Sequence, residues 1–129
     1  MSQFDTIDDD NLQVLVNTFY DDVRRDDLLG PIFEIRIGAS WQRHMDRMVD
    51  FWSSVLLGTG RFRGNPMLKH ALIPDISEAH FDRWMELFKL TVDRLFTPEQ
   101  AGLILMRAGN MRRGLERYAV AKPVLQVVG

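Results

Sequence analysis

The chain has 129 residues, of which 46% are hydrophobic, and a formal net charge of −2. This length predicts one domain, 1–129, and the absence of cysteine excludes disulfides and cysteine-based zinc or iron–sulfur sites. The mixed charges lack the basic face that nucleic acid needs, and no apolar run approaches the roughly 20 residues of a membrane span, so we expect a soluble, cytoplasmic protein.

Apolar residues recur at helical spacing along most of the chain, and alternating strand patterns are nearly absent, which predicts an all-α fold. The first helix is expected over about residues 9–26. Its core-facing stripe and two flanking residues are Leu12, Val16, Phe19, Val23, Leu15 and Tyr20. Gly30 and Pro31 interrupt the pattern, so we expect a short turn there. A second long helix is expected over about residues 40–57, with Ser40 as its N-cap.

A short helix is predicted in the middle of the chain. Asn65 and Pro66 form a helix start, and Pro74 limits the helix to about residues 67–72. A helix of this length is marginal on its own, so it needs a tertiary partner or a ligand to hold it.

Two more long helices follow. Ser77 is expected to cap the first, which runs to about Phe96 with a stripe made of Phe81, Trp84, Phe88, Val92 and Leu95. The motif "TPEQ" at 97–100 begins the last helix, since it combines a threonine cap, a proline at the first position and a glutamine. The tail, about 120–129, is expected to be loose. The prediction is therefore four substantial helices and at least one short helix.

The three histidines differ in their surroundings. His70 lies among apolar residues on the short helix, where it is either satisfied by backbone groups or serves as an axial metal ligand. His80 is the third residue after Ser77, which favours a role at the helix start. His44 shares an apolar stripe with Met48, so it points into a pocket or acts as a gate at its edge. A zinc site of three histidines is disfavoured because no two are four residues apart.

Tyr20 and Trp84 are polar-tipped residues on apolar stripes. The simplest interpretation of either residue alone is a core aromatic side chain whose O–H or N–H group is hydrogen-bonded. Two such donors facing one apolar cavity would be able to hydrogen-bond a polar diatomic ligand.

Three stretches in this order carry a family resemblance: "FYDDVRRDDLLGPIF", "WQRHMDRMVDFWSSVLLGTGRFRGNPMLKHALIP" and "HFDRWMELF". Together they span residues 19–88, about half the chain. The chain resembles truncated haemoglobins, and group III most of all, because the loop "LLGTGRFRGNP" lacks the glycine pair that other groups carry before the proximal helix. The resemblance implies a globin-like, two-over-two helical sandwich around haem.

The resemblance also implies residue roles. His70 corresponds to the proximal histidine and would bind haem iron, and Phe33 to the aromatic residue that wedges the haem. The residues expected on the distal side are Tyr20, His44, Met48 and Trp84. Of these, Tyr20, His44 and Trp84 would contact the gaseous ligand, with His44 either gating the pocket or binding iron when no gas is present. Three basic residues lie near the expected position of the propionates: Arg61, Arg63 and Lys69.

The implied function is binding of O₂, NO or CO at a pentacoordinate haem b. Hydrogen bonds to a charged acceptor contribute roughly 1.5–3 kcal/mol, so two distal donors would slow O₂ release. Slow release favours ligand chemistry, such as NO or oxidative-stress detoxification, over bulk oxygen transport. An NO dioxygenase or peroxidase activity would require a reductase as partner. The alternative is a haem-free helical sensor or interaction module of globin fold. For either function we expect a monomer or a weak dimer.

Overall fold

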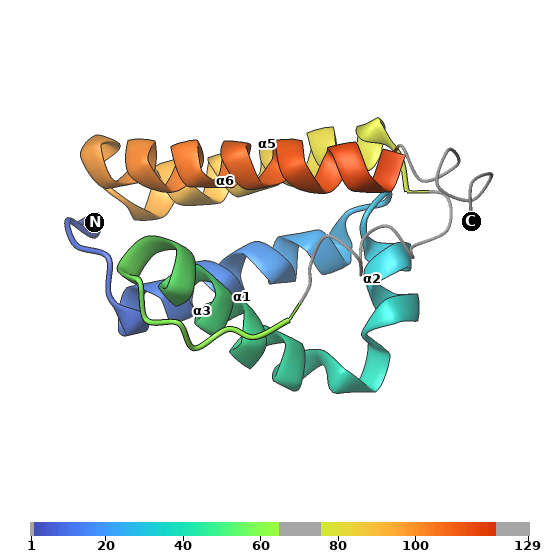
Figure 1. The fold of residues 1–129 in the computed structure, drawn as a ribbon, viewed down its shortest axis with the longest axis horizontal. Helices are drawn as coiled ribbons and strands as arrows, with labels where there is room; N and C mark the ends of the chain where they lie inside the picture. The colour runs from blue at the N-terminus through green and yellow to red at the C-terminus, as the bar shows by residue number, and fades with distance from the viewer. Residues whose placement is uncertain (1, 65–75, 121–129) are drawn as a thin grey trace.

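The computed structural model describes residues 2–64 and 76–120, and these ranges show an all-α fold in two layers. The elements in chain order are α1 (Asp9–Arg25), α2 (Gly30–Arg36), the 3₁₀ turn η1 (Gly38–Ser40), α3 (Trp41–Leu57), α5 (Glu78–Leu95) and α6 (Pro98–Val120). In Figure 1, α5 and α6 form one layer over α1 and α3, and α2 stands at one end. The predicted two-over-two helical arrangement is therefore confirmed.

Helix α1 is the central element, since it packs against α2, α3 and α5. It begins at Asp8, whose side chain accepts a hydrogen bond from the backbone N–H of Asn11 at 2.8 Å, as an N-cap should. The whole predicted stripe is buried, including Leu15 and Tyr20. This helix therefore places Tyr20 in the middle of the fold.

The turn expected around Gly30 and Pro31 is wrong, because this segment forms helix α2. Proline is favoured in the first turn of a helix, where its missing N–H costs nothing. The carboxylate of Asp26 accepts from the backbone N–H groups of Leu28 and Leu29 at 3.0 and 2.9 Å. The glycine allows close approach to α1, since a Cβ at position 30 would lie 2.7 Å from the carbonyl oxygen of Arg24. Gly30 and Pro31 therefore mark the start of a helix that follows a tight turn of the chain.

Helix α3 has the predicted bounds, but Ser40 makes no capping hydrogen bond with its side chain. The 3₁₀ turn leads directly into the helix, and the Ser40 N–H donates to the Ile37 carbonyl at 2.9 Å. The helix ends at Gly58, whose φ of 70° is the left-handed conformation that glycine adopts most easily. Helix α3 lies beside α1. Its start is set by the 3₁₀ turn and its end by the backbone conformation of Gly58.

The loop after α3 is tied to α1 and α3. The hydroxyl of Ser54 accepts from the backbone N–H of Phe62 at 3.0 Å. The guanidinium of Arg61 pairs with Asp9 at 2.7 Å and with Asp50 at 3.2 Å. These contacts fix where Phe62 lies.

Helix α5 begins at Ser77 and ends one residue before the expected Phe96, and α6 follows after Thr97. The N-terminal segment closes this corner, because the Phe4 N–H donates to Leu95 and the Thr97 N–H donates to Phe4, at 2.8 and 2.9 Å. The predicted short helix at 67–72 and most of the tail lie outside the described residues.

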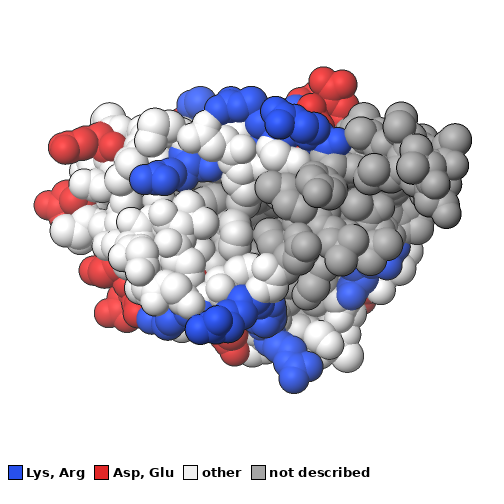
Figure 2. Space-filling view, viewed as in Figure 1, with Lys and Arg blue, Asp and Glu red and all other residues white. Residues whose placement is uncertain are grey.

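The core lies between the layers and is rich in aromatic residues. The rings of Trp52 and Trp84 stack on Phe88 at centroid distances of 5.1 and 4.8 Å, and Phe19 meets Phe88 edge-on at 5.0 Å. None of the helices that the structure describes is long and apolar enough to span a membrane. On the face seen in Figure 2, the described Lys and Arg side chains lie in separate groups toward its edges, and form no continuous basic patch.

Asp26 is a sensitive point of this fold. Its side chain is only 7% exposed, and it also accepts from Arg83 of α5 at 2.9 Å. Replacing Asp26 with Ala should lower the free energy of unfolding by about 1–3 kcal/mol, because the N–H groups of Leu28 and Leu29 and the guanidinium of Arg83 lose their acceptor. Thermal unfolding should show a drop of several degrees in Tm. The matched control is Asp27→Ala at the exposed neighbouring position, and equal effects of the two changes would contradict the assignment.

Candidate functional site

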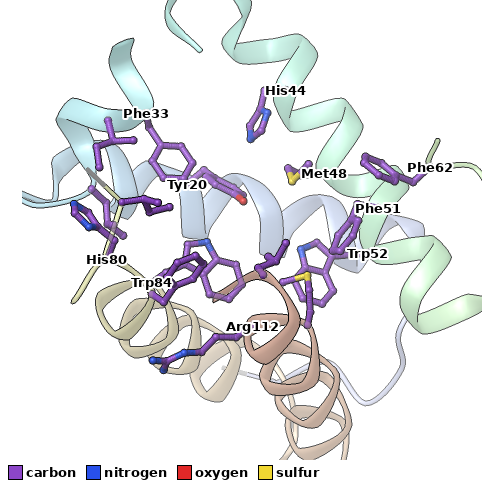
Figure 3. Close-up of a pocket in the computed structure, with 16 residues that line it drawn as sticks. Tyr20, Phe33, His44, Met48, Phe51, Trp52, Phe62, His80, Trp84 and Arg112 are labelled. Atoms are coloured by element: carbon purple, nitrogen blue, oxygen red, sulfur yellow. The ribbon is translucent and has the colours of Figure 1, made fainter. Parts of the chain in front are cut away.

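A cavity lies between the two helical layers (Figure 3). Its volume of about 140 Å³ is roughly ten times what one water molecule needs, so it is no packing defect. Each α-helix that the structure describes contributes to its wall. The lining residues are Tyr20, Leu29, Ile32, Phe33, His44, Met48, Phe51, Trp52, Phe62, Ile76, His80, Phe81, Trp84, Met111, Arg112 and Leu115. A mostly apolar wall with a few polar groups is typical of a ligand site.

Tyr20 and Trp84 meet at this cavity from opposite layers. Figure 3 shows Tyr20 projecting from α1 and Trp84 rising from α5. The indole N–H of Trp84 is directed toward the hydroxyl of Tyr20. Burial raises the pKa of Tyr20 well above its ordinary value, and the interaction with Trp84 only partly opposes this shift. Tyr20 is therefore a neutral phenol whose own proton remains available for donation.

His44 and Phe33 surround Tyr20 on the side of α2 and α3. The ring centroids of His44 and Phe33 lie 5.6 and 5.7 Å from that of Tyr20. His44 is half-buried and its Nε2 atom is inaccessible to solvent. The structure thus gathers four of the residues named from sequence: Tyr20, Phe33, His44 and Trp84.

Met48 and three aromatic residues continue the wall along α3 and the following loop. Phe62 lies edge-on to Phe51 at 5.2 Å, and the guanidinium of Arg47 lies 4.9 Å over the Phe62 ring. Arg47 also donates to the Arg63 carbonyl at 2.9 Å. Sequence reasoning missed Arg47, although it lies three residues after His44 and so on the same helical face. Arg61, which was considered, instead pairs with Asp9 and Asp50.

The remaining wall comes from the ends of α5 and α6. His80 has the predicted role at the helix start, since its Nδ1 accepts from the Ser77 backbone N–H at 3.0 Å. It also lines the cavity, which was not foreseen. Arg112, likewise missed, bonds Glu116 at 2.9 Å and also contacts Asp82. Partial burial works against its charge, yet these carboxylates raise the pKa of Arg112.

His70, the expected metal ligand, lies outside the described residues. Within ranges 2–64 and 76–120, no group of three His, Asp or Glu residues could hold a metal ion. What the described residues offer is an apolar, aromatic wall with hydrogen-bond donors gathered near Tyr20. This arrangement suits a flat apolar molecule with a small polar ligand beside it.

Comparison with known proteins agrees with this geometry. The family model described as bacterial-like globin matches residues 2–112. The group 3 truncated hemoglobin ctb of Campylobacter jejuni is 36% identical over 109 residues, covering 82% of this chain and 86% of that protein. A crystal structure of the group III truncated hemoglobin from Campylobacter jejuni superposes with a TM-score of 0.86 at 32% identity, covering 90% of this chain and 94% of that one. The chain therefore belongs to the bacterial-like globin family, as a truncated haemoglobin of the group III type.

Proposed function

We propose that this globin holds a haem b in the cavity, with His70 as the axial ligand of the iron, and that it binds small diatomic gases on the side of Tyr20. The observation that carries the proposal is the convergence of Tyr20 and Trp84 on an apolar, aromatic cavity. The globin family supports haem binding itself, and the details of the site are proposals.

The cavity wall suits a haem. The macrocycle is flat and apolar, and its neighbours would be Phe33, Met48 and Phe62. Its propionates need cations at the rim, and Arg47, which lies over Phe62, is well placed to supply one. When bound, the haem supplies an iron that takes up O₂, NO or CO.

The choice of His70 rests on what the other two histidines do. His44 lies beside Tyr20, on the side proposed for the gas. The Nδ1 atom of His80 is engaged with the backbone of Ser77. His70 is the remaining histidine, and it matches the proximal position of the family.

Two donors acting in series favour retention of the gas. Because the Trp84 indole interacts with the Tyr20 hydroxyl and burial keeps the phenol neutral, the Tyr20 proton is available to another acceptor. A diatomic ligand that carries partial negative charge would accept it, at a gain of roughly 1.5–3 kcal/mol. Such a site releases O₂ slowly, which suits NO or oxidative-stress detoxification better than bulk transport.

Replacing His70 with Ala should abolish haem binding or change the Soret spectrum, because the iron loses its axial ligand. Absorbance of the purified protein and hemin titration measure this. The matched control is His80→Gln, since glutamine is also suited to the third position of the helix, and it should keep its haem. Unchanged haem content and spectrum in His70→Ala would contradict the proposal. A colourless wild-type protein that does not bind added hemin would contradict it as well.

Replacing Tyr20 with Phe should raise the O₂ dissociation rate by roughly one to two decades, the equivalent of one hydrogen bond to a charged acceptor. Trp84→Phe should raise it less, because the effect of Trp84 passes through Tyr20. Stopped-flow displacement measures both rates. Leu90→Ala, at an exposed position of α5 that does not line the cavity, serves as the control. Unaltered rates in both donor variants would remove the distal role.

The pH dependence follows from the raised pKa of Tyr20. An exposed tyrosine ionises near pH 10, so O₂ dissociation should stay flat through about that pH, because Tyr20 keeps its proton. Stability should fall as pH rises above about 10, since the unfolded chain then releases the tyrosine proton while the folded chain keeps it. Phenolate absorbance of Tyr118→Phe, which leaves Tyr20 as the one tyrosine, checks this. Titration of Tyr20 near the ordinary value would contradict it.

A further inference from the structure

A cation and an indole ring stack at the corner where α1, α2 and α3 meet. The guanidinium carbon of Arg24 lies 4.2 Å from the ring centroid of Trp41. The Trp41 ring also lies beside the site, with its centroid 6.2 Å from that of Tyr20 and 6.5 Å from that of His44. Trp41 is not among the residues that line the cavity. It lies behind Tyr20 and His44, two of the polar residues that line the cavity and are called the polar wall below. The exposed Arg24 stacks on it.

The position of Arg24 is set by the backbone. Arg24 belongs to the last turn of α1, and Gly30 packs so closely on it that a Cβ would lie 2.7 Å from the Arg24 carbonyl oxygen. Trp41 is the first residue of α3. The stack therefore joins the end of one rigid helix to the start of another, close to His44.

His44 is more accessible to solvent than Tyr20. It is half-buried, whereas Tyr20 is only 4% exposed. Trp41 lies one helical turn before it on the same face of α3, since residues three apart are neighbours on a helix. The Trp41 and His44 ring centroids lie 6.5 Å apart, so the position of the Trp41 ring affects that of the imidazole, and the exposed Arg24 stacks on Trp41.

We propose that Arg24, acting through Trp41, is a positioning residue for His44 that sets the rate at which small ligands reach and leave the cavity. The inference rests on the proposed function, in which the cavity takes such ligands. Arg24 contacts no ligand. Its effect is limited to how readily His44 moves to open the cavity.

A barrier of this kind has a distinct kinetic signature. Loosening it speeds passage in both directions, so association and dissociation rates rise by the same factor and the affinity is unchanged. A contact of this strength at a partly exposed site corresponds to roughly two- to five-fold in the population of the open wall. Loss of a distal donor would instead raise the dissociation rate alone.

The test uses the haem-bound full chain and CO as the probe, with rates from flash photolysis and ligand displacement. Arg24→Gln should raise both rates roughly two- to five-fold, and Arg24→Lys, which keeps a cation, should restore most of the wild-type behaviour. Arg25→Gln is the control, because the Arg25 side chain is exposed and pairs at 3.9 Å with Asp22. In a Trp41→Leu background, Arg24→Gln should have no further effect, since the two residues act as one unit.

A second readout is independent of gas binding. Arg24→Gln should shift the indole N–H resonance of Trp41 and the ring resonances of His44 in NMR spectra, whereas Arg25→Gln should not. Equal CO rates in wild type and Arg24→Gln, additive effects in the double variant, or unshifted resonances would each overturn the inference. A wild type that binds neither haem nor CO would overturn the proposed function instead, and the NMR comparison would still decide whether Arg24 positions His44.

Discussion

The contact between Trp84 and Tyr20 is the interaction on which the site depends. It joins α5 of one layer to α1 of the other at the point where the cavity opens between them. Both residues also pack on Phe19, at centroid distances of 4.8 Å for Tyr20 and 5.2 Å for Trp84. The same aromatic core that holds the layers together therefore fixes the direction of the two donors. Neither donor can turn away without disturbing that packing.

Burial gives this pair its chemical character. Taking Tyr20 out of water raises its pKa and keeps the phenol neutral. It also strengthens any hydrogen bond that the phenol makes, because few competing water dipoles surround it. A donor that is buried and oriented by its aromatic neighbours loses little entropy when a ligand arrives. The low exposure that stabilises the fold thus also favours tight retention of a polar ligand.

The long helices could be predicted from sequence because their apolar residues repeat at helical spacing. Helix α2 could not be predicted in this way. Gly30 and Pro31 are typical of a turn, and the hydrogen bonds at the helix start require the Asp26 carboxylate to reach two backbone N–H groups. The meeting of Tyr20 and Trp84 was inferred from family resemblance, because residues so far apart in sequence carry no local signal. Arg47 and Arg112 were missed for a related reason: the direction of a long side chain is set by its neighbours, here Phe62 for the first and Glu116 for the second.

The two sides of the polar wall differ in how firmly they are held, and this separates two properties of the site. Tyr20 is enclosed by Phe19, Phe33 and Trp84, so the strength of its bond to a ligand is set deep in the core. His44 is more exposed than Tyr20 and lies beside Trp41, which is partly buried against the core and has an exposed cation stacked on its ring. A contact with a surface cation is weaker and easier to alter than packing in the core. Substitutions at the corner of α1 and α3 would therefore be able to change how fast ligands pass while the core keeps the affinity nearly constant.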